Sequence, residues 1–137
     1  MKKKKIEISV IMGVYNPKSR AQLQQAVRSV INQTFQEWEM LICDDGSDKS
    51  YIPIIEETSK LDERIILIRN EKNQGLAHAL NECLKRARGR YIARMDDDDI
   101  ALPDRFEKQC RFLEEHPEFQ WTGFHRVSQD GLDLPTS

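Results

Sequence analysis

Apolar residues along this 137-residue chain gather in short runs that alternate with longer segments of helical spacing. The short runs are rich in β-branched and aliphatic residues, which is typical of strands. The run around Glu39 is otherwise apolar on both faces, as expected for a strand in a sheet that is covered on both sides. We therefore predict strands at residues 6–12, 38–43, 64–69, 90–95 and 119–127.

The segments between those runs carry the i, i+3, i+4 spacing of amphipathic helices. A first helix is predicted at 18–33, with Asn16-Pro17 as a turn and helix start, and a weaker one at 49–60. A third helix should begin after Gly75 and a fourth at Pro103. The predicted core-facing residues are Leu23, Ala26, Val27, Val30 and Ile31 in the first helix, Leu76, Leu80, Cys83, Leu84 and Ala87 in the third, and Phe106, Cys110 and Leu113 in the fourth.

Strand and helix therefore alternate along most of the chain. Such alternation is the pattern of βαβ units with right-handed crossovers. The predicted fold class is α/β, a three-layer α/β/α arrangement around a mostly parallel sheet.

Length and charge agree with a single domain over residues 1–137. A net charge of -2 gives no reason to expect a nucleic-acid partner. No apolar run approaches the ~20 residues of a membrane-spanning helix, so we expect no transmembrane segment. Residues 1–5 are interpreted as a flexible basic flank. Because only LDLPTS follows the hairpin-turn dipeptide Asp130-Gly131, we expect the chain to be a fragment of a longer protein.

The cysteine positions do not predict a metal site. Cys43, Cys83 and Cys110 include no CxxC pair, so neither structural zinc nor a disulfide framework is expected. We interpret them as small buried residues in a reducing compartment. With no secretory signal at the N-terminus, this predicts a cytoplasmic protein.

Polar segments follow four of the predicted strands in turn. They are GVYNP from residue 13, DDGSD from residue 44, NEKNQG from residue 70 and DDDD from residue 96. Ligands of open parallel sheets bind at the carboxyl ends of the strands. These segments should therefore converge on one rim of the sheet.

The run Asp96 to Asp99 places four carboxylates directly after an apolar strand. In an extended segment, Asp96 and Asp98 would point one way and Asp97 and Asp99 the other. Two carboxylates about 6.5 Å apart repel by roughly 2.5 kcal/mol at an effective dielectric constant of about 20, so the run needs water, raised pKa values or a cation. Mg²⁺ or Mn²⁺ prefers such oxygens and often leaves positions open for phosphate. The alternative is a solvated loop in which Asp99 or Asp104 caps a helix.

Other acidic and phosphate-binding motifs fit less well. The chain contains no GxxxxGK[ST] P-loop, and neither DDGSDKS nor DDDDI carries the EF-hand glycine at its place. A phosphotransferase with Asp96 as nucleophile fits Asp96, Asp98 and Ile100 loosely, but it leaves Asp44-Asp45 without a role. That chemistry is the runner-up, and a non-catalytic nucleotide-binding or partner-binding module is the third possibility.

Five segments, in order between residues 6 and 128, resemble the N-terminal half of family 2 glycosyltransferases with the GT-A fold. They are SVIMGVYN, SVINQTF, WEMLICDDGSDKS, NQGLAHALN and GRYIARMDDDDIALPDRFEKQ. The resemblance implies transfer of a sugar, with inversion, from a nucleotide-diphosphate sugar to a sugar or lipid-linked acceptor in glycan or polysaccharide synthesis, and a UDP-sugar is favoured. It also leaves open a peripheral association of the full-length protein with the inner membrane face.

The resemblance also implies roles for individual residues. Asp45 would accept a hydrogen bond from the imide N–H of the base, with Asp44 as the neighbour that shares the role. A carboxylate suits this task because it only accepts and the imide donates. The nucleotide-binding residues implied by position are Gly13, Val14, Tyr15, Asp44, Asp45, Asn73, Gly75, Asp96 and Asp97.

The DxD motif of the family falls on Asp96-Asp97-Asp98. By resemblance, Asp98 binds the Mg²⁺ or Mn²⁺ that bridges the two phosphates, and Asp96 or Asp97 contacts the ribose or completes the metal shell. The metal would neutralise charge on the departing diphosphate. Arg94 either assists or pairs with an Asp.

Two positions depart from the family pattern. Leu80 precedes Asn81 where many relatives carry Arg, which puts a phosphate contact from this helix in doubt. The motif reads DDDD where a small residue is common at its second place, which leaves the metal-holding pair open. The general base and the acceptor pocket of the family lie in the second half of the fold. They are expected beyond Ser137, and no residue here is assigned as catalytic.

Overall fold

The structure is a computed structural model that describes residues 5–116 and 124–126. The predicted alternation is confirmed there, with shifted element ends. The fifth strand is described only at its centre, and Asp130-Gly131 lies outside the described residues. The elements are β1 (Ile8–Val14), α1 (Arg20–Ile31), β2 (Trp38–Asp45), η1 (Lys49–Tyr51), α2 (Ile52–Ser59), β3 (Ile65–Asn70), α3 (Leu76–Arg86), β4 (Tyr91–Arg94), α4 (Arg105–Glu115) and β5 (Phe124–Arg126).

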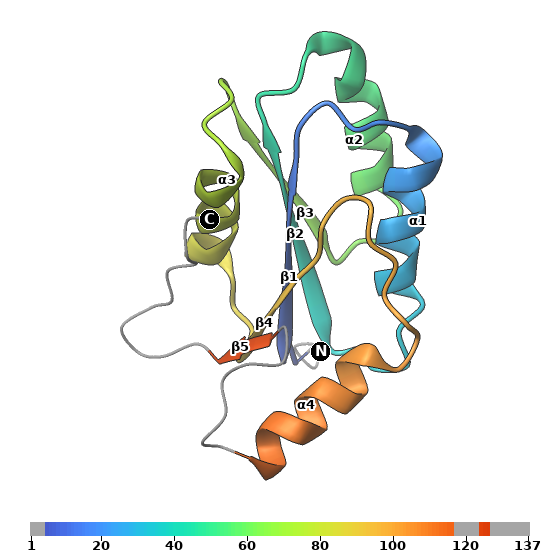
Figure 1. Ribbon diagram of the computed structural model, residues 1–137, viewed down its shortest axis with the longest axis vertical. Coiled ribbons are helices and arrows are strands. Elements are labelled where there is room, and N and C mark those ends of the chain that lie inside the picture. The colour runs from blue at the N-terminus through green and yellow to red at the C-terminus, as the bar shows by residue number, and fades with distance from the viewer. Residues whose placement is uncertain (1–4, 117–123, 127–137) are drawn as a thin grey trace.

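The strands form one sheet in the order β3-β2-β1-β4-β5. β1 pairs in parallel with both β2 and β4, and β2 pairs in parallel with β3, whereas β5 runs antiparallel to β4. Helices cover both faces, with α3 on one side and α1 and α2 on the other (Figure 1). The predicted three-layer, mostly parallel α/β class is therefore confirmed.

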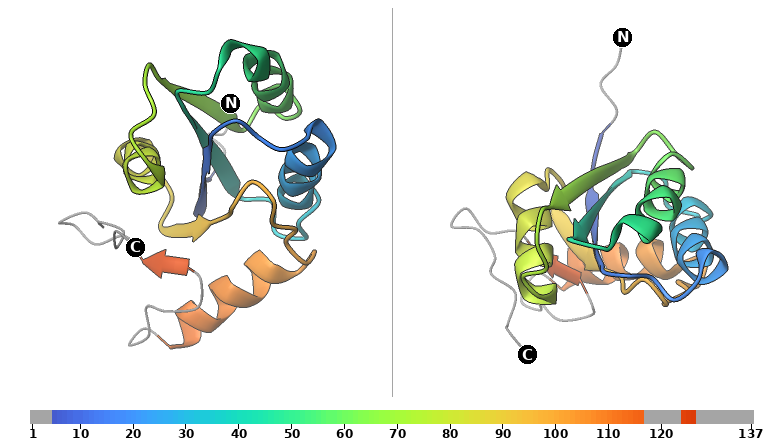
Figure 2. Two further views of the ribbon diagram at one scale, coloured as in Figure 1. Left: turned by 45° about the horizontal axis from the view of Figure 1, so that its top comes forward. Right: turned by 90° about the horizontal axis from the view of Figure 1, so that it is seen from above.

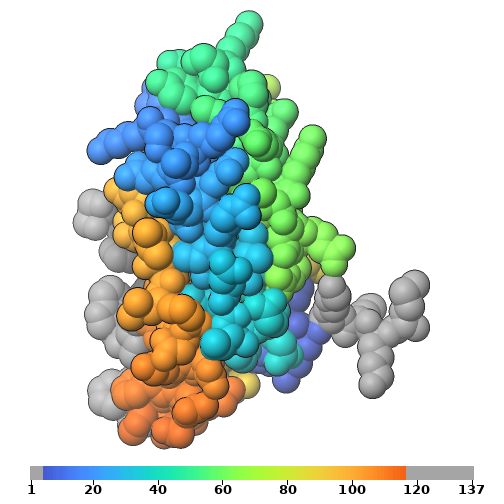
Figure 3. Space-filling view, turned by 90° about the vertical axis from the view of Figure 1, so that its right-hand side faces the viewer, coloured from blue at the N-terminus to red at the C-terminus, as the bar shows by residue number. Residues whose placement is uncertain are grey.

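Alternate side chains of the central strands supply two separate cores. Ile8, Val10, Met12 and Val14 of β1 pack in the core that also holds residues of α1, α2 and α4. Ile11 faces the smaller core beneath α3. The views in Figure 2 show α3 alone on its face, and Figure 3 shows α1 between α2 and the segment that leads into α4. A sheet buried on both faces explains why its strands read as nearly continuous apolar runs.

Helix α1 begins later than predicted. Its N-cap is Ser19, whose hydroxyl oxygen accepts a hydrogen bond from the Gln22 backbone N–H at 3.0 Å. Pro17 is therefore not at the first helical position, and the predicted helix start was wrong. Asn16 instead adopts a positive φ of 44°, which Asn tolerates better than most residues, and it turns the chain away from the end of β1. The reason is local, because a serine hydroxyl caps the free N–H groups of the first turn.

Glu39 interrupts β2 as a buried carboxylate that is only 1% exposed. It accepts hydrogen bonds from the Ser9 hydroxyl at 2.6 Å and from the Arg88 backbone N–H at 2.7 Å, and Arg88 Nε donates at 3.0 Å. The acid thereby ties β1, β2 and the segment that follows α3 together at the amino ends of the strands.

Replacing Glu39 with Ala should lower the free energy of unfolding by about 3 kcal/mol, because it removes a buried, hydrogen-bonded carboxylate and leaves the Ser9 hydroxyl without its acceptor. Urea titration measures this change. Glu37→Ala, two residues earlier and exposed, is the matched control and should shift stability by no more than about 0.5 kcal/mol. Equal effects of the two substitutions would contradict the structural role of Glu39.

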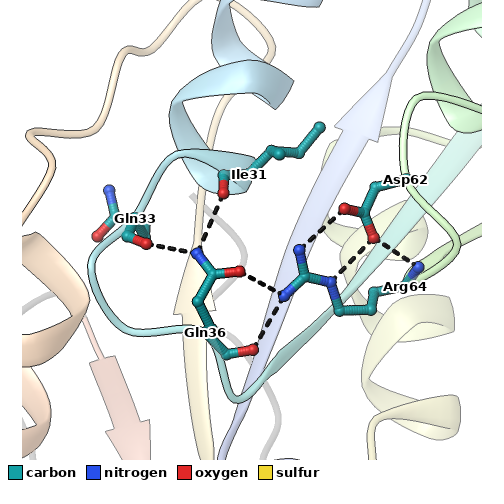
Figure 4. Close-up of polar contacts among 5 residues, drawn as sticks. All are labelled: Ile31, Gln33, Gln36, Asp62 and Arg64. Carbon is teal, nitrogen blue, oxygen red and sulfur yellow. Dashed lines mark hydrogen bonds and ion pairs between the residues drawn. The ribbon is translucent and has the colours of Figure 1, made fainter.

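At the same end of the sheet, Arg64 joins the loop before β2 to the loop before β3 (Figure 4). Its guanidinium bonds both carboxylate oxygens of Asp62, at 2.9 and 2.8 Å, and donates to the backbone and side-chain oxygens of Gln36, both at 2.9 Å. The guanidinium also lies 3.7 Å from the centroid of the Trp38 ring, a cation–π contact. The loops before β2 and β3 are therefore held together by hydrogen bonds from the Arg64 guanidinium.

Two further expectations concern burial and membrane insertion. Cys43, Cys83 and Cys110 are free and buried, and burial raises the pKa of each thiol to about 12, which confirms them as buried residues. Across residues 5–116 and 124–126, no helix has the length and apolar character needed to cross a bilayer.

Candidate functional site

The carboxyl ends of the parallel strands meet at one rim of the sheet. The strand register places Val14 beside Asp44, and Asp45 beside Asn70. The Met95 backbone N–H donates to Ile11 of β1 at 3.0 Å, so the Asp run leaves the sheet next to β1. Segments that are far apart in the sequence are thus brought to the same edge.

A cavity of about 240 Å³ opens at this rim, between the end of β1 and the start of α3. Six predicted nucleotide-binding residues lie in its wall, and two residues that were not predicted join them. The lining is Gly13, Val14, Tyr15, Asp45, Asn73, Gly75, Leu76 and Ala79. A single buried carboxylate among largely apolar walls is the usual composition of a small-molecule site.

Leu76 was predicted to face the core, but the structure places it in the cavity wall, 46% exposed. Helical spacing identified the correct face of α3, but the first turn of that helix lies over Gly13, where the cavity opens, so Leu76 is covered only in part. A Cβ added at Gly13 would lie 2.7 Å from Leu76 Cδ1, so the glycine makes room for this leucine. Tyr15, 47% exposed, supplies another apolar surface.

Asp45 is the polar group of the cavity and is only 3% exposed. Its Oδ1 accepts from Asn70 Nδ2 at 3.0 Å and from the Gln74 backbone N–H at 3.1 Å. Its Oδ2 accepts from the Gly75 N–H at 2.8 Å and, more distantly, from the same Gln74 N–H at 3.2 Å. The carboxylate therefore holds the loop that follows β3 while it faces the cavity.

Asp44 does not line the cavity, although it was predicted to share the role of Asp45. Its Oδ1 accepts from the Ser47 N–H at 3.0 Å, and its Oδ2 pairs with Arg69 at 3.4 Å. With 1% exposure it stabilises the turn after β2. Successive residues of a strand point to opposite faces, which explains why the two acids separate.

Two loops at the rim are joined through Asn16, which the sequence interpretation treated only as part of a turn. Its backbone N–H donates to Ser47 Oγ at 2.9 Å, and its Oδ1 accepts from the Asp48 N–H at 2.9 Å. These bonds fix the segment that carries Tyr15 to the DDGS turn.

Gly46 allows the DDGS turn to approach the loop after β3. Its φ is 74°, and an added Cβ would lie 2.5 Å from both the Asn73 nitrogen and the Lys72 carbonyl carbon. Because both neighbours are backbone atoms, no side-chain rotation could relieve the contact. The cavity wall thus depends on a glycine at this position.

The Asp run is a turn and not an extended segment, so the predicted alternation of its side chains was wrong. β4 ends at Arg94, and the Asp99 N–H donates to the Asp96 carbonyl at 3.1 Å. An i to i+3 bond reverses the chain and brings the first and fourth residues together. Asp96, Asp98 and Asp99 each place a carboxylate oxygen within 4.8 Å of the others.

The donor chemistry of this cluster suits a hard divalent cation such as Mg²⁺ or Mn²⁺. Asp96 and Asp98, the predicted ligands, are both in it, and Asp99 is an addition that the turn explains. Asp97 is half-buried and outside the cluster. Burial, and then the carboxylates of Asp98 and Asp96, raise the pKa of Asp97. Arg94 lies 3.6 Å from Asp96, which favours the pairing role left open for it.

A larger cavity of about 520 Å³ opens at the opposite end of the strands. Its charged lining residues are engaged with protein groups: Arg64 with Asp62 and Gln36, and Arg88 with Glu39. We therefore assign the candidate site to the smaller cavity and the Asp cluster.

Comparison with known proteins identifies the family of this chain. The sequence profile of the family described as "Glycosyl transferase family 2" matches residues 9–135. The chain belongs to glycosyltransferase family 2. This family membership favours the glycosyltransferase interpretation over the aspartyl-phosphate alternative.

Family 2 relatives with similar sequences include two proteins of Bacillus subtilis (strain 168). The putative glycosyltransferase EpsE is 42% identical over 118 residues, which are 85% of this chain and 42% of that protein. The putative teichuronic acid biosynthesis glycosyltransferase TuaG is 41% identical over 128 residues, 93% of this chain and 50% of that protein. The chain therefore spans about half the length of these relatives.

Solved structures show the same fold. S. aureus TarS 1–349 in complex with UDP matches with a TM-score of 0.72 and 26% identity, over 82% of this chain and 33% of that one. The mannosyltransferase PcManGT from Pyrobaculum calidifontis, in complex with GDP-Man and Mn2+, matches with a TM-score of 0.70 and 18% identity, over 80% of this chain and 32% of that one. The predicted GT-A fold is thereby confirmed.

Proposed function

We propose that this chain is the donor-binding part of an inverting glycosyltransferase that takes a nucleotide-diphosphate sugar, with a UDP-sugar favoured. The proposal rests on two features at one rim of the GT-A sheet. One is a largely apolar cavity that holds the Asp45 carboxylate, and the other is a cluster of three acids. The cavity suits a nucleoside whose base carries a hydrogen-bond donor. The acidic cluster suits a divalent cation that also binds a diphosphate. The TarS complex with UDP supports the choice of base.

In this proposal the base lies against Gly13, Val14 and Tyr15, and Asn73 and Gly75 close over the nucleoside. Asp97, which is half-buried beside the cluster, would contact the ribose. Binding in this largely apolar cavity would orient the donor and exclude water from its base.

Asp98 and Asp96 would hold Mg²⁺ or Mn²⁺, and Asp99 is close enough to join them. When bound, the metal would neutralise negative charge on the diphosphate leaving group. The acceptor, a sugar or a lipid-linked sugar, and the general base are assigned to the part of the relatives' length that this chain does not span. The biological role proposed is glycan or polysaccharide synthesis, as in the relative TuaG.

Calorimetry with UDP, with and without Mn²⁺, tests the proposal. Asp45→Ala should weaken UDP binding about tenfold or more under both conditions, because a hydrogen bond to a charged group is lost. Glu71→Ala, an exposed acid on the neighbouring loop, is the matched control and should bind as the wild type does. Failure of the wild-type chain to bind UDP in the presence of Mn²⁺ would overturn the proposal.

A further inference from the structure

We propose that Gln33, assisted by Ser29, is a positioning residue for the metal site. The two side chains join the end of α1 to residues 101–106, the segment that follows the acidic cluster. They thereby fix the place of that cluster at the rim of the sheet. The inference rests on the proposed function, because that function places a divalent cation at the cluster.

The side-chain amide of Gln33 is fully engaged in the interior, where the residue is only 2% exposed. Its Nε2 donates to the Leu102 carbonyl at 2.6 Å and to the Ser29 carbonyl at 3.1 Å. Its Oε1 accepts from the Phe106 N–H at 3.0 Å. The position needs a donor and an acceptor on one side chain, because a carbonyl only accepts and a backbone N–H only donates. An ionised glutamate would lack the donor, and methionine would lack both groups.

Gln33 also supplies a cap for α4. Within residues 5–116, the side chain of Asp104, the N-cap residue of α4, makes no capping hydrogen bond. The first N–H groups of a helix have no partner inside that helix. Phe106 is the second residue of α4, and its N–H is satisfied by the Gln33 oxygen. The start of α4 is therefore held by a side chain from the end of α1.

Two neighbouring hydrogen bonds hold the same segment. Ser29 Oγ accepts from the Ala101 N–H at 3.0 Å, and the Thr34 N–H donates to the Pro103 carbonyl at 2.8 Å. Figure 3 shows α1 beside the segment that leads into α4. The chain between the acidic cluster and α4 is thus attached to α1 at successive residues.

The acidic cluster lies in a turn between two attached ends. Before it, the Met95 N–H donates to the Ile11 carbonyl of β1, and after it Ala101 is buried and bonded to α1. Inside the turn, the N–H groups of Asp96 and Asp99 bond to oxygens of each other's residue, both at 3.1 Å. The internal bonds set the shape of the turn, and the attached ends set its place. Small displacements of ligand oxygens weaken a metal site, so release of one end should lower the metal affinity without removing a ligand.

Calorimetry with UDP and with uridine, each with and without Mn²⁺, tests the inference. Gln33→Met keeps the length of the side chain and removes its three hydrogen bonds. We expect its UDP affinity with Mn²⁺ to fall at least about fivefold, and its uridine affinity to stay within about twofold of the wild-type value. Uridine serves as the reference because Gln33 does not line the cavity at Asp45.

Glu39→Ala is the control for a general loss of stability. It removes a buried hydrogen-bonding group at the amino ends of the strands, away from the acidic cluster. This variant should be destabilised and yet keep the wild-type gain in UDP affinity that Mn²⁺ gives. A merely structural Gln33 would behave in the same way, so Gln33→Met with the wild-type gain overturns the inference while the proposed function stands.

Ser29→Ala is a milder second variant, because it removes only the acceptor of the Ala101 N–H. We expect it to lower the UDP affinity with Mn²⁺ about threefold and to leave uridine binding unchanged. If Gln33→Met does not fold, Ser29→Ala decides, and an unchanged gain from Mn²⁺ overturns the inference. A wild-type chain that does not bind UDP with Mn²⁺ overturns the proposed function as well.

Discussion

Asp98→Ala should remove the metal-dependent part of UDP binding, so that its UDP affinity with Mn²⁺ equals its affinity without metal. Asp98 is an exposed member of the acidic cluster, and its carboxylate oxygen lies within 4.8 Å of those of Asp96 and Asp99. In the proposed metal site, removal of one of the three carboxylates would leave too few charged oxygens to bind the cation tightly. Since loss of partners outside the ligand shell already weakens metal sites by about 10- to 100-fold, we expect the UDP affinity with Mn²⁺ to fall at least about tenfold.

Calorimetry with UDP and with uridine separates the two parts of the site. Binding of uridine, which has no phosphate, should be unchanged in Asp98→Ala. Asp104→Ala removes a nearby acid that pairs with Lys108 at 2.9 Å and lies outside the cluster, so it should leave Mn²⁺-dependent binding intact. Full metal dependence in Asp98→Ala would show that the diphosphate is bound elsewhere.

Gly46→Ala should lower the free energy of unfolding by roughly 2–4 kcal/mol. Two effects add at this position. The positive φ of 74° is unfavourable for any residue with a Cβ, and that Cβ would meet two backbone atoms at 2.5 Å. The loop must move away to relieve the contact, and the hydrogen bonds that Asn70, Gln74 and Gly75 donate to Asp45 would be distorted.

Chemical denaturation measures the loss of stability, and UDP titration measures the damage to the cavity. Gln74→Ala is the control, because its exposed side chain is removed while the backbone N–H that bonds to Asp45 is kept. We expect a change of no more than about 0.5 kcal/mol from that control. A Gly46→Ala variant as stable as the wild type would show that the two loops are not packed as described.

The sequence was sufficient to predict the layers and the rim. Its strands are apolar on both faces and its helices carry one apolar face, so each local pattern has one consistent place in an α/β fold. Glu39 was the one polar exception noted in a central strand. Its partners, Ser9 and Arg88, come from distant segments, so the reason for its burial could not be read locally.

Loop geometry was less accessible, because individual hydrogen bonds within and between loops determine it. The Asp run was expected to extend the strand, yet the bond from the Asp99 N–H to Asp96 turns it and adds Asp99 to the cluster. Leu76 fits a buried helical face by spacing, but it lies over Gly13, where the cavity opens. Four acids directly after a strand are a signal that could have identified the turn. An apolar residue directly after a glycine loop is a signal that could have identified the cavity wall.

Asn70 and Gly46 illustrate a different limit. Nothing in their local sequence distinguishes them from ordinary loop residues, since their roles arise only when β3 is placed beside β2. The strand register puts Asn70 next to Asp45, and the packing of two loops requires a glycine at position 46. Such residues become visible only once the topology is known.

An anomalous diffraction map from crystals of the chain grown with Mn²⁺ and UDP would locate the metal and the base in one experiment. We expect a manganese peak within about 2.5 Å of carboxylate oxygens of Asp98 and of Asp96 or Asp99, in contact with the diphosphate, and the uracil in the cavity beside Asp45. Well-ordered UDP with no manganese at the acidic cluster, or with its base outside that cavity, would show that the donor does not bind as proposed.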